Sequence, residues 1–156
     1  MMDEHEQRKC ELQSTLFEES LKTFSCSSSF FIAKFMNSEI AKRMDDINNP
    51  YNYYSLQLII DFMKDRYPSL NKKIGHKYPP NVIKWIGYIY RAWSIIAKKT
   101  SYKIYKIMKS DNLLLLYDSY HTFSPEYCVE QLEELVSEGK KKSKSDYLLF
   151  KTIYSK

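Results

Sequence analysis

The stretch from Pro80 to Lys99, PNVIKWIGYIYRAWSIIAKK, constrains the fold more than any other part of this sequence. Its large apolar residues recur at alternating steps of four and three, which places them on one face of a helix: Val82, Ile86, Ile89, Trp93 and Ile96. A second apolar row runs beside the first and consists of Ile83, Tyr90 and Ala97. The remaining polar strip is narrow and contains Lys84, Tyr88, Arg91 and Lys98. A helix this apolar is normally covered on most sides, so residues 80–99 are predicted to form the central helix of the fold.

Gly87 lies in the middle of this helix, where glycine costs roughly 1 kcal/mol relative to alanine. Ser94 follows two turns later on the same side. We interpret Gly87 and Ser94 as positions at which a neighbouring backbone comes close.

The composition favours helices over a many-stranded sheet. The 156 residues include only three glycines and five prolines, so turn residues are scarce between the long periodic runs. The length is sufficient for one domain with a hydrophobic core. The sequence therefore predicts an all-α, compact single-domain bundle of about six or seven helices around residues 80–99. The domain is expected at residues 1–138, followed by a lysine-rich tail at 139–156.

Apolar periodicity and capping residues predict the other helices. They cover residues 3–24, 29–46 with a break at Asn37-Ser38, 54–66 after an N-cap at Ser55, 101–108 after Thr100 or Ser101, a helix capped by Ser110 or Asp111, and 125–138. Ser124-Pro125-Glu126 is a strong start for the last helix, and Gly139 is expected to end it. The residues expected to face inward include Leu58 and, in the last helix, Tyr127, Cys128, Leu132 and Leu135.

Several features point to a bacterial protein of the cytoplasm. No run reaches the eighteen or so apolar residues that a membrane span requires. The first residues, MMDEHEQRKCELQ, are acidic and charged and do not resemble a signal peptide. Three widely spaced cysteines (Cys10, Cys26 and Cys128) favour reduced thiols over a disulfide framework or a zinc site. The Lys, Asn, Tyr and Ile bias is typical of an AT-rich bacterial genome.

Signatures of catalysis are missing from the sequence. It has no Gly-rich phosphate loop, no G-x-S-x-G and no H-E-x-x-H. His5, His76 and His121 are far apart, and none has a partner at ligand spacing. His121 precedes the Ser124 cap, and packing at the helix entry explains it better than catalysis does. We therefore predict that the chain is not an enzyme and binds no cofactor or metal.

The charges are segregated along the chain. Residues 1–63 have a net charge of −4, and residues 64–109 carry twelve Lys and Arg against one Asp. Residues 110–138 contain seven acids and no Lys or Arg, and residues 139–156 contain six lysines and one Asp. Segregation of this kind marks surfaces that attract partners or each other.

The basic segment allows a nucleic-acid interpretation. Lysines cluster beside Tyr102 and Tyr105, at Lys98, Lys99, Lys103, Lys106 and Lys109. The helices at 101–108 and 110–118 could form a helix-turn-helix within segment 98–118, and the lysines could bind phosphates. The acidic block at 110–138 follows directly, however, and charge pairing within the fold or with a protein is the alternative. A DNA-binding regulator therefore remains the second hypothesis.

Two stretches resemble a known family. Residues 120–132 contain the frame H-T-x-x-P-x-Y-x-V-E-x-(I/L), which is similar to the C-terminal end of small uncharacterised proteins from clostridia and related Firmicutes. The W-I-G-Y-I-Y-R of residues 85–91, the S-x-x-I-Y-K of residues 101–106 and the F-I-x-x-F-M-x-S of residues 31–38 resemble the same group. The resemblance covers about half of the chain.

Members of that family tend to be encoded beside ADP-ribosyltransferase-like toxins. The resemblance therefore implies an antitoxin or accessory component of a toxin–antitoxin locus that neutralises its cognate toxin by protein–protein contact. Four residues are candidates for partner binding: Tyr120, His121, Thr122 and Glu130. Residues 1–24 and the tail are candidate partner-contacting arms. Binding of operator DNA and formation of a homodimer are further expectations.

Overall fold

The computed structural model describes residues 1–48 and 55–154, with side chains described as far as Lys140. In chain order, the described residues form α1 (Glu4–Thr23), α2 (Ser28–Met36), α3 (Glu39–Asp45), α4 (Leu56–Arg66), the 3₁₀ helix η1 (Pro68–Asn71), α5 (Pro80–Ala97), α6 (Ser101–Ile107), α7 (Ser110–Tyr120) and α8 (Pro125–Tyr154). These residues contain no strand, so the predicted all-α class is confirmed. The eight α-helices exceed the predicted number by one, because the break at Asn37-Ser38 divides the second helix into α2 and α3.

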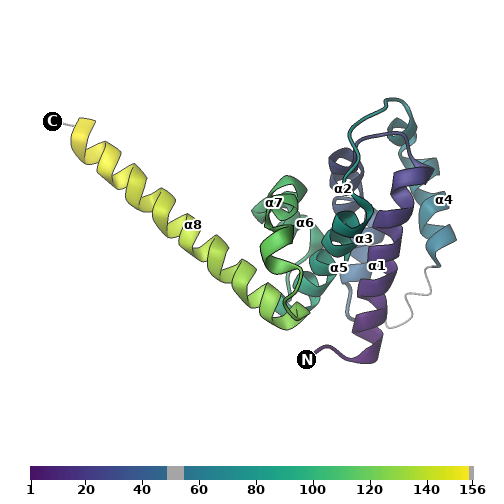
Figure 1. The fold of residues 1–156 in the computed structure, drawn as a ribbon, viewed down its shortest axis with the longest axis horizontal. Coiled ribbons are helices and arrows are strands. Elements are labelled where there is room, and N and C mark those ends of the chain that lie inside the picture. The colour runs from purple at the N-terminus through teal and green to yellow at the C-terminus, as the bar shows by residue number, and fades with distance from the viewer. Residues whose placement is uncertain (49–54, 155–156) are drawn as a thin grey trace.

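Helix α5 is the central element, as its sequence predicts, and α1 packs along it (Figure 1). The apolar rows of α5 are buried except for the half-buried Ile96 and Ala97 at its end, and Ile83, Ile86 and Trp93 are fully covered. A Cβ atom built on Gly87 would lie 2.7 Å from the main-chain oxygen of Gln13 in α1. The close approach predicted at Gly87 is therefore confirmed.

Helix α1 belongs to the core rather than forming a separate arm. Its residues Leu16 and Phe17 are fully buried. An Asp3 capping box begins the helix, in which Asp3 and Glu6 each accept a hydrogen bond from the other's main-chain N–H. The exposed residues of α1 include both acidic and basic side chains, among them Glu4, Arg8 and Glu11.

Serine side chains cap α2, α3 and α4, and the cap predicted at Ser55 is confirmed. Ser27, Ser38 and Ser55 each accept a hydrogen bond from the main-chain N–H three residues later. In α4, Leu58 is 51% exposed and the prediction that it faces inward is wrong. Ile60 is buried instead.

Helix α6 is capped by Thr100 as predicted, whereas the cap predicted for α7 is wrong. The N-cap residue of α7 is Lys109, and no side chain caps this helix. Ser110 and Asp111 bind the hydroxyl of Tyr78 instead: its oxygen lies 3.1 Å from Ser110 Oγ, and it donates a hydrogen bond to the Asp111 carboxylate. The side chains of Ser110 and Asp111 therefore bind Tyr78 and do not cap the helix.

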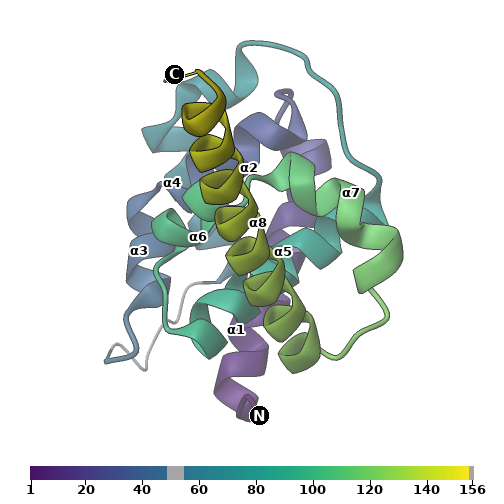
Figure 2. The same cartoon turned by 90° about the vertical axis from the view of Figure 1, so that its left-hand side faces the viewer.

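Helix α8 begins at the predicted cap, where Ser124 Oγ accepts a hydrogen bond from the N–H of Tyr127. It does not end at Gly139, and the prediction of a stop there is wrong: the helix continues to Tyr154. Figure 1 shows that its C-terminal half projects away from the bundle, and in Figure 2 the helix runs toward the viewer in front of the other elements. Cys128 and Leu132 are buried as predicted, but Tyr127 and Leu135 are 46% and 37% exposed.

In the described part of the chain, none of the helices combines the length and the apolar character required to cross a membrane.

Candidate partner-binding surface

The polar interior of the bundle is organised by Arg91, which the sequence places on the exposed strip of α5. That prediction is wrong, because the Arg91 side chain is fully buried. Its guanidinium donates hydrogen bonds to Gln13 Oε1 at 2.9 Å and to Ser101 Oγ at 3.2 Å, and it forms an ion pair with Asp45 Oδ1 at 2.6 Å. Gln13 in turn donates to the main-chain oxygen of Gly87 at 2.9 Å.

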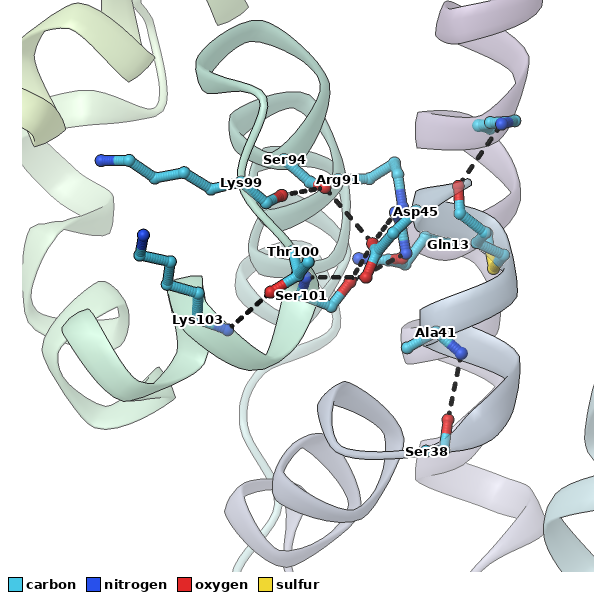
Figure 3. A network of polar contacts seen from close by, with 12 residues as sticks. Gln13, Ser38, Ala41, Asp45, Arg91, Ser94, Lys99, Thr100, Ser101 and Lys103 are labelled. Atoms are coloured by element: carbon cyan, nitrogen blue, oxygen red, sulfur yellow. Dashed lines mark hydrogen bonds and ion pairs between the residues drawn. The ribbon is translucent and has the colours of Figure 1, made fainter. Parts of the chain in front are cut away.

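Asp45 completes this network and connects three helices (Figure 3). Its carboxylate accepts hydrogen bonds from the N–H of Ser101 at 2.9 Å, from the hydroxyl of Ser101 at 2.6 Å and from the hydroxyl of Ser94 at 3.3 Å. Because Asp45 ends α3, Ser94 lies in α5 and Ser101 begins α6, the network holds α6 against the core. Both charges are compensated, so the arrangement is structural.

Two surface hollows lie on either side of Asp45 and Thr100, which line both of them. One, of about 570 Å³, is lined mainly by the residues that connect α2 to α3, with Tyr67 and Tyr102 at its edge. The other, of about 630 Å³, lies between the start of α1 and the ends of α3 and α5. Both acidic and basic residues line the second hollow, so its charge selects no particular ligand.

The titratable groups of the described residues do not converge on a reactive centre. Burial raises the pKa of the Cys10 and Cys128 thiols to about 12, which keeps them protonated at neutral pH. The three histidines belong to separate elements: His5 to α1, His76 to the loop before α5 and His121 to the end of α7. In the described residues, no three His, Cys, Asp or Glu side chains lie close enough together to hold a metal ion.

Two groups of three aromatic rings lie at the α7–α8 turn. The Trp85 and Tyr117 rings meet edge to face, and the His121 ring stacks on Tyr117 with centroids 4.3 Å apart. Phe123 contacts both Tyr120 at 5.3 Å and Tyr127 at 4.8 Å. We call these six residues the aromatic turn. Aromatic groups at a partly exposed surface are typical anchors of protein interfaces.

The four residues predicted to bind a partner lie at or beside the aromatic turn. Tyr120 is half-buried, and burial raises the pKa of its hydroxyl. His121 is exposed, and its Nδ1 lies 2.8 Å from the main-chain oxygen of Tyr117, which fixes the ring. Thr122 is exposed in the turn, and Glu130 is exposed on α8. The sequence analysis did not identify Trp85, Tyr117 and Phe123 as part of this surface, and the contact of Trp85 with Tyr117 joins two helices distant in the sequence.

Of the five lysines in segment 98–118, Lys99 forms an ion pair with a described residue and the other four do not. Lys99 Nζ lies 2.8 Å from both carboxylate oxygens of Glu133, which also accepts a hydrogen bond from Trp93 Nε1 at 2.9 Å. Burial opposes ionisation of Glu133, but the hydrogen bonds from Lys99 and Trp93 outweigh it and lower the pKa of this carboxyl. The exposed lysines form no ion pair with any described residue: Lys98, Lys103, Lys106 and Lys109.

The fold and this surface define a small all-α protein with a partly exposed aromatic turn and four exposed lysines near its α6 helix. Comparison with protein-family models, with curated proteins and with solved structures finds no match to the chain.

Proposed function

We propose that the chain is a non-catalytic, cytoplasmic protein-binding module of the antitoxin class, which neutralises a cognate toxin by direct contact. The aromatic turn is the observation that carries this proposal. It offers large rigid aromatic side chains, which are typical hot spots of protein interfaces, and acidic residues lie beside them. The dispersed histidines and protonated thiols further support a role without catalysis, and the proposal requires no cofactor.

The mode of neutralisation follows from the resemblance of residues 120–132 to proteins encoded beside ADP-ribosyltransferase-like toxins. A toxin of that kind binds NAD in a cleft. A helical surface with partly exposed aromatic side chains is suited to fill or distort such a cleft. His121 and Glu130 are exposed, so they are available for contact without any change in the core.

Co-expression with the product of the adjacent gene tests the proposal. We expect that product to arrest growth alone, to be tolerated together with this chain and to be retained by it in a pull-down. The double variant His121→Ala and Glu130→Ala should weaken retention about tenfold or more. Ile74→Ala is the matched control, since Ile74 is 92% exposed in the loop before α5. A neighbour that is neither toxic nor retained refutes the proposal.

The second candidate function is DNA binding. It is favoured by the four exposed lysines that form no ion pair with a described residue. Lys103 and Lys106 lie on α6, with Lys106 Nζ 4.5 Å from the ring centre of Tyr102. In a helix-turn-helix, α7 would be the recognition helix, yet it carries Asp111 and Asp118 and no Lys or Arg. DNA affinity would therefore depend on phosphate contacts rather than base contacts.

A gel-shift titration across salt, using DNA from the chain's own operon, separates the two functions. Phosphate contacts by these lysines predict that the double variant Lys103→Gln and Lys106→Gln reduces the salt slope by about two. If the wild-type protein causes no retardation at low salt, the DNA-binding function is excluded.

A further inference from the structure

Lysine side chains lie over aromatic rings at two places on the part of the surface that α2, the end of α4 and α6 form. Lys34 Nζ lies 5.5 Å from the ring centre of Phe30 and 5.9 Å from that of Tyr67. Lys106 Nζ lies 4.5 Å from the ring centre of Tyr102. Each place therefore combines a positive charge with an aromatic ring, within reach of one bound group.

The two tyrosines, Tyr67 and Tyr102, line the same surface hollow of about 570 Å³, which we call the tyrosine hollow. It forms where the connection between α2 and α3 faces the start of α6, because α6 packs against both helices. In Figure 3, Ser38 and Thr100, which line the hollow, lie on opposite sides of it. Tyr102 is 51% exposed, so much of this side chain is open to a ligand.

The charge at the tyrosine hollow is mainly positive. Lys42 lines it, and Lys34 and Lys106 lie over the tyrosines that line it. None of these three lysines forms an ion pair with a residue that the structure describes. Of the two acids in the lining, Asp45 is compensated by its buried ion pair, which leaves the exposed Glu39. Three lysines against one carboxylate favour an anionic ligand.

We propose that the tyrosine hollow and the lysines beside it bind single-stranded nucleic acid. Unpaired bases stack on exposed aromatic side chains, and lysines beside those rings attract the neighbouring phosphates. A duplex offers the same phosphates, but its bases stack on each other and are not available to a tyrosine ring. The rings therefore favour a single strand over a duplex.

This inference differs from both candidate functions above and rests on neither. The antitoxin function uses the aromatic turn, which lies on α5, α7 and α8 and takes no part in the tyrosine hollow. The helix-turn-helix function needs duplex DNA bound by α6 and α7. Stacking on Tyr102 has no role in that mode of binding.

Fluorescence anisotropy of a labelled oligothymidine tests the inference with the full chain. A strand of about ten nucleotides is long enough to cross the hollow. We expect saturable binding in about 50 mM salt and weaker binding as the salt concentration rises. The same strand annealed to its complement should bind about tenfold more weakly or less, because stacking is lost.

Substitution of Tyr102 separates stacking from charge. Tyr102→Ala should weaken binding of the strand about fivefold or more, whereas Tyr102→Phe keeps the ring and should bind like the wild type. Tyr127→Ala is the matched control, since Tyr127 is 46% exposed on the aromatic turn. Circular dichroism of the variants checks that the fold is unchanged, as expected for side chains this exposed.

Substitution of the lysines tests the phosphate contacts. The double variant Lys34→Gln and Lys42→Gln should reduce the salt slope for the strand by about 1.4, or about 0.7 for each phosphate contact. The control Lys84→Gln with Lys140→Gln removes the same charge from exposed positions on α5 and α8, and its slope should equal that of the wild type.

Four outcomes overturn the inference: no binding of the strand in low salt, a duplex bound as tightly as the strand, unchanged binding by Tyr102→Ala, or displacement of the strand by polyglutamate as readily as by unlabelled strand. The last outcome would identify a surface for acidic proteins. A chain that binds the strand and retains no toxin would support this inference and count against the antitoxin function. Toxin retention without strand binding would do the reverse.

Discussion

Arg91 places a guanidinium group in the interior of the bundle, where its charge is compensated by Asp45 at 2.6 Å. Removing one partner of a buried ion pair leaves the other charge without compensation. We therefore expect Asp45→Ala to lower the free energy of unfolding by about 3–5 kcal/mol, measured by urea denaturation. This loss should appear although Asp45 is at the end of a short helix.

The exposed pair of Arg8 and Glu4 is the control for this prediction. Its two groups lie 2.7 Å apart, but their side chains are 67% and 81% exposed. Glu4→Ala should change the free energy of unfolding by no more than about 1 kcal/mol. Equal losses in the two variants would mean that the Asp45 network does not stabilise the fold.

Two glycines within helices should respond to alanine in opposite directions. At Gly87 a methyl group would lie 2.7 Å from the main-chain oxygen of Gln13, so α1 has to shift. We expect Gly87→Ala to lower the free energy of unfolding by about 1–3 kcal/mol, despite the better helix propensity of alanine. Gly139 has open space around it, so Gly139→Ala should increase helix content by circular dichroism without loss of stability.

Arg91 also shows why part of the interior could not be predicted. The helical repeat places it beside Lys84 and Tyr88, so periodicity alone assigns it to the polar strip. Its burial depends on Asp45 and Gln13, which come from helices distant in the sequence. The close approach at Gly87 was predictable because glycine lowers the stability of an otherwise strong helix. Its presence there indicates that a larger side chain would not fit.

At the scale of whole elements, Glu133 connects α8 to the C-terminal end of α5. It accepts hydrogen bonds from Trp93 in α5 and from Lys99, two residues after that helix. The pKa of Glu133 is lowered in the folded protein from its ordinary value of about 4.5. A carboxyl with a depressed pKa stabilises the fold above its unfolded pKa, and this stability is lost as the pH falls through the folded pKa. The contribution of Glu133 is therefore complete at neutral pH and declines below about pH 4.5.

Substitution of Glu133 by Gln should remove this pH dependence. We expect the variant to unfold at lower urea concentration than the wild type at pH 7, and the difference should shrink as the pH falls below about 4.5. Parallel urea titrations at several pH values measure the effect. Glu134→Gln is the matched control, since Glu134 is exposed and forms no ion pair with a described residue. A difference that grows on acidification would contradict the assigned direction of the pKa shift.

Helix starts were predictable where a cap is a local interaction. Ser27, Ser38, Ser55, Thr100 and Ser124 each bind an N–H three residues away, which the sequence alone can indicate. The cap predicted for α7 failed because the Tyr78 side chain, more than thirty residues earlier, takes the hydroxyl of Ser110. The stop predicted at Gly139 failed because a glycine ends a helix only when the backbone leaves helical conformation there. The strong helix formers that follow continue the helix.

At the scale of the whole molecule, some residues of the candidate surface are adjacent in the sequence, and others come together only in the folded chain. Tyr120, His121 and Thr122 adjoin one another in sequence, so any fold brings them together. Trp85 joins them only because α7 packs on α5, which the sequence does not reveal. Whether this surface binds a toxin stays a prediction for the co-expression test.

The molecule consists of a bundle and a helical extension, and the two should make unequal contributions to stability. Leu132 is fully buried, whereas residues Ser137 to Lys140 are exposed, so the contact of α8 with the bundle ends near Val136. A chain that stops after Gly139 should therefore unfold cooperatively, with a free energy of unfolding within about 1 kcal/mol of the full chain, while Leu132→Ala should lose about 2–5 kcal/mol. Urea denaturation of the two variants and of the full chain measures both differences. If the shortened chain lost as much stability as Leu132→Ala, residues 140–154 would belong to the folded core.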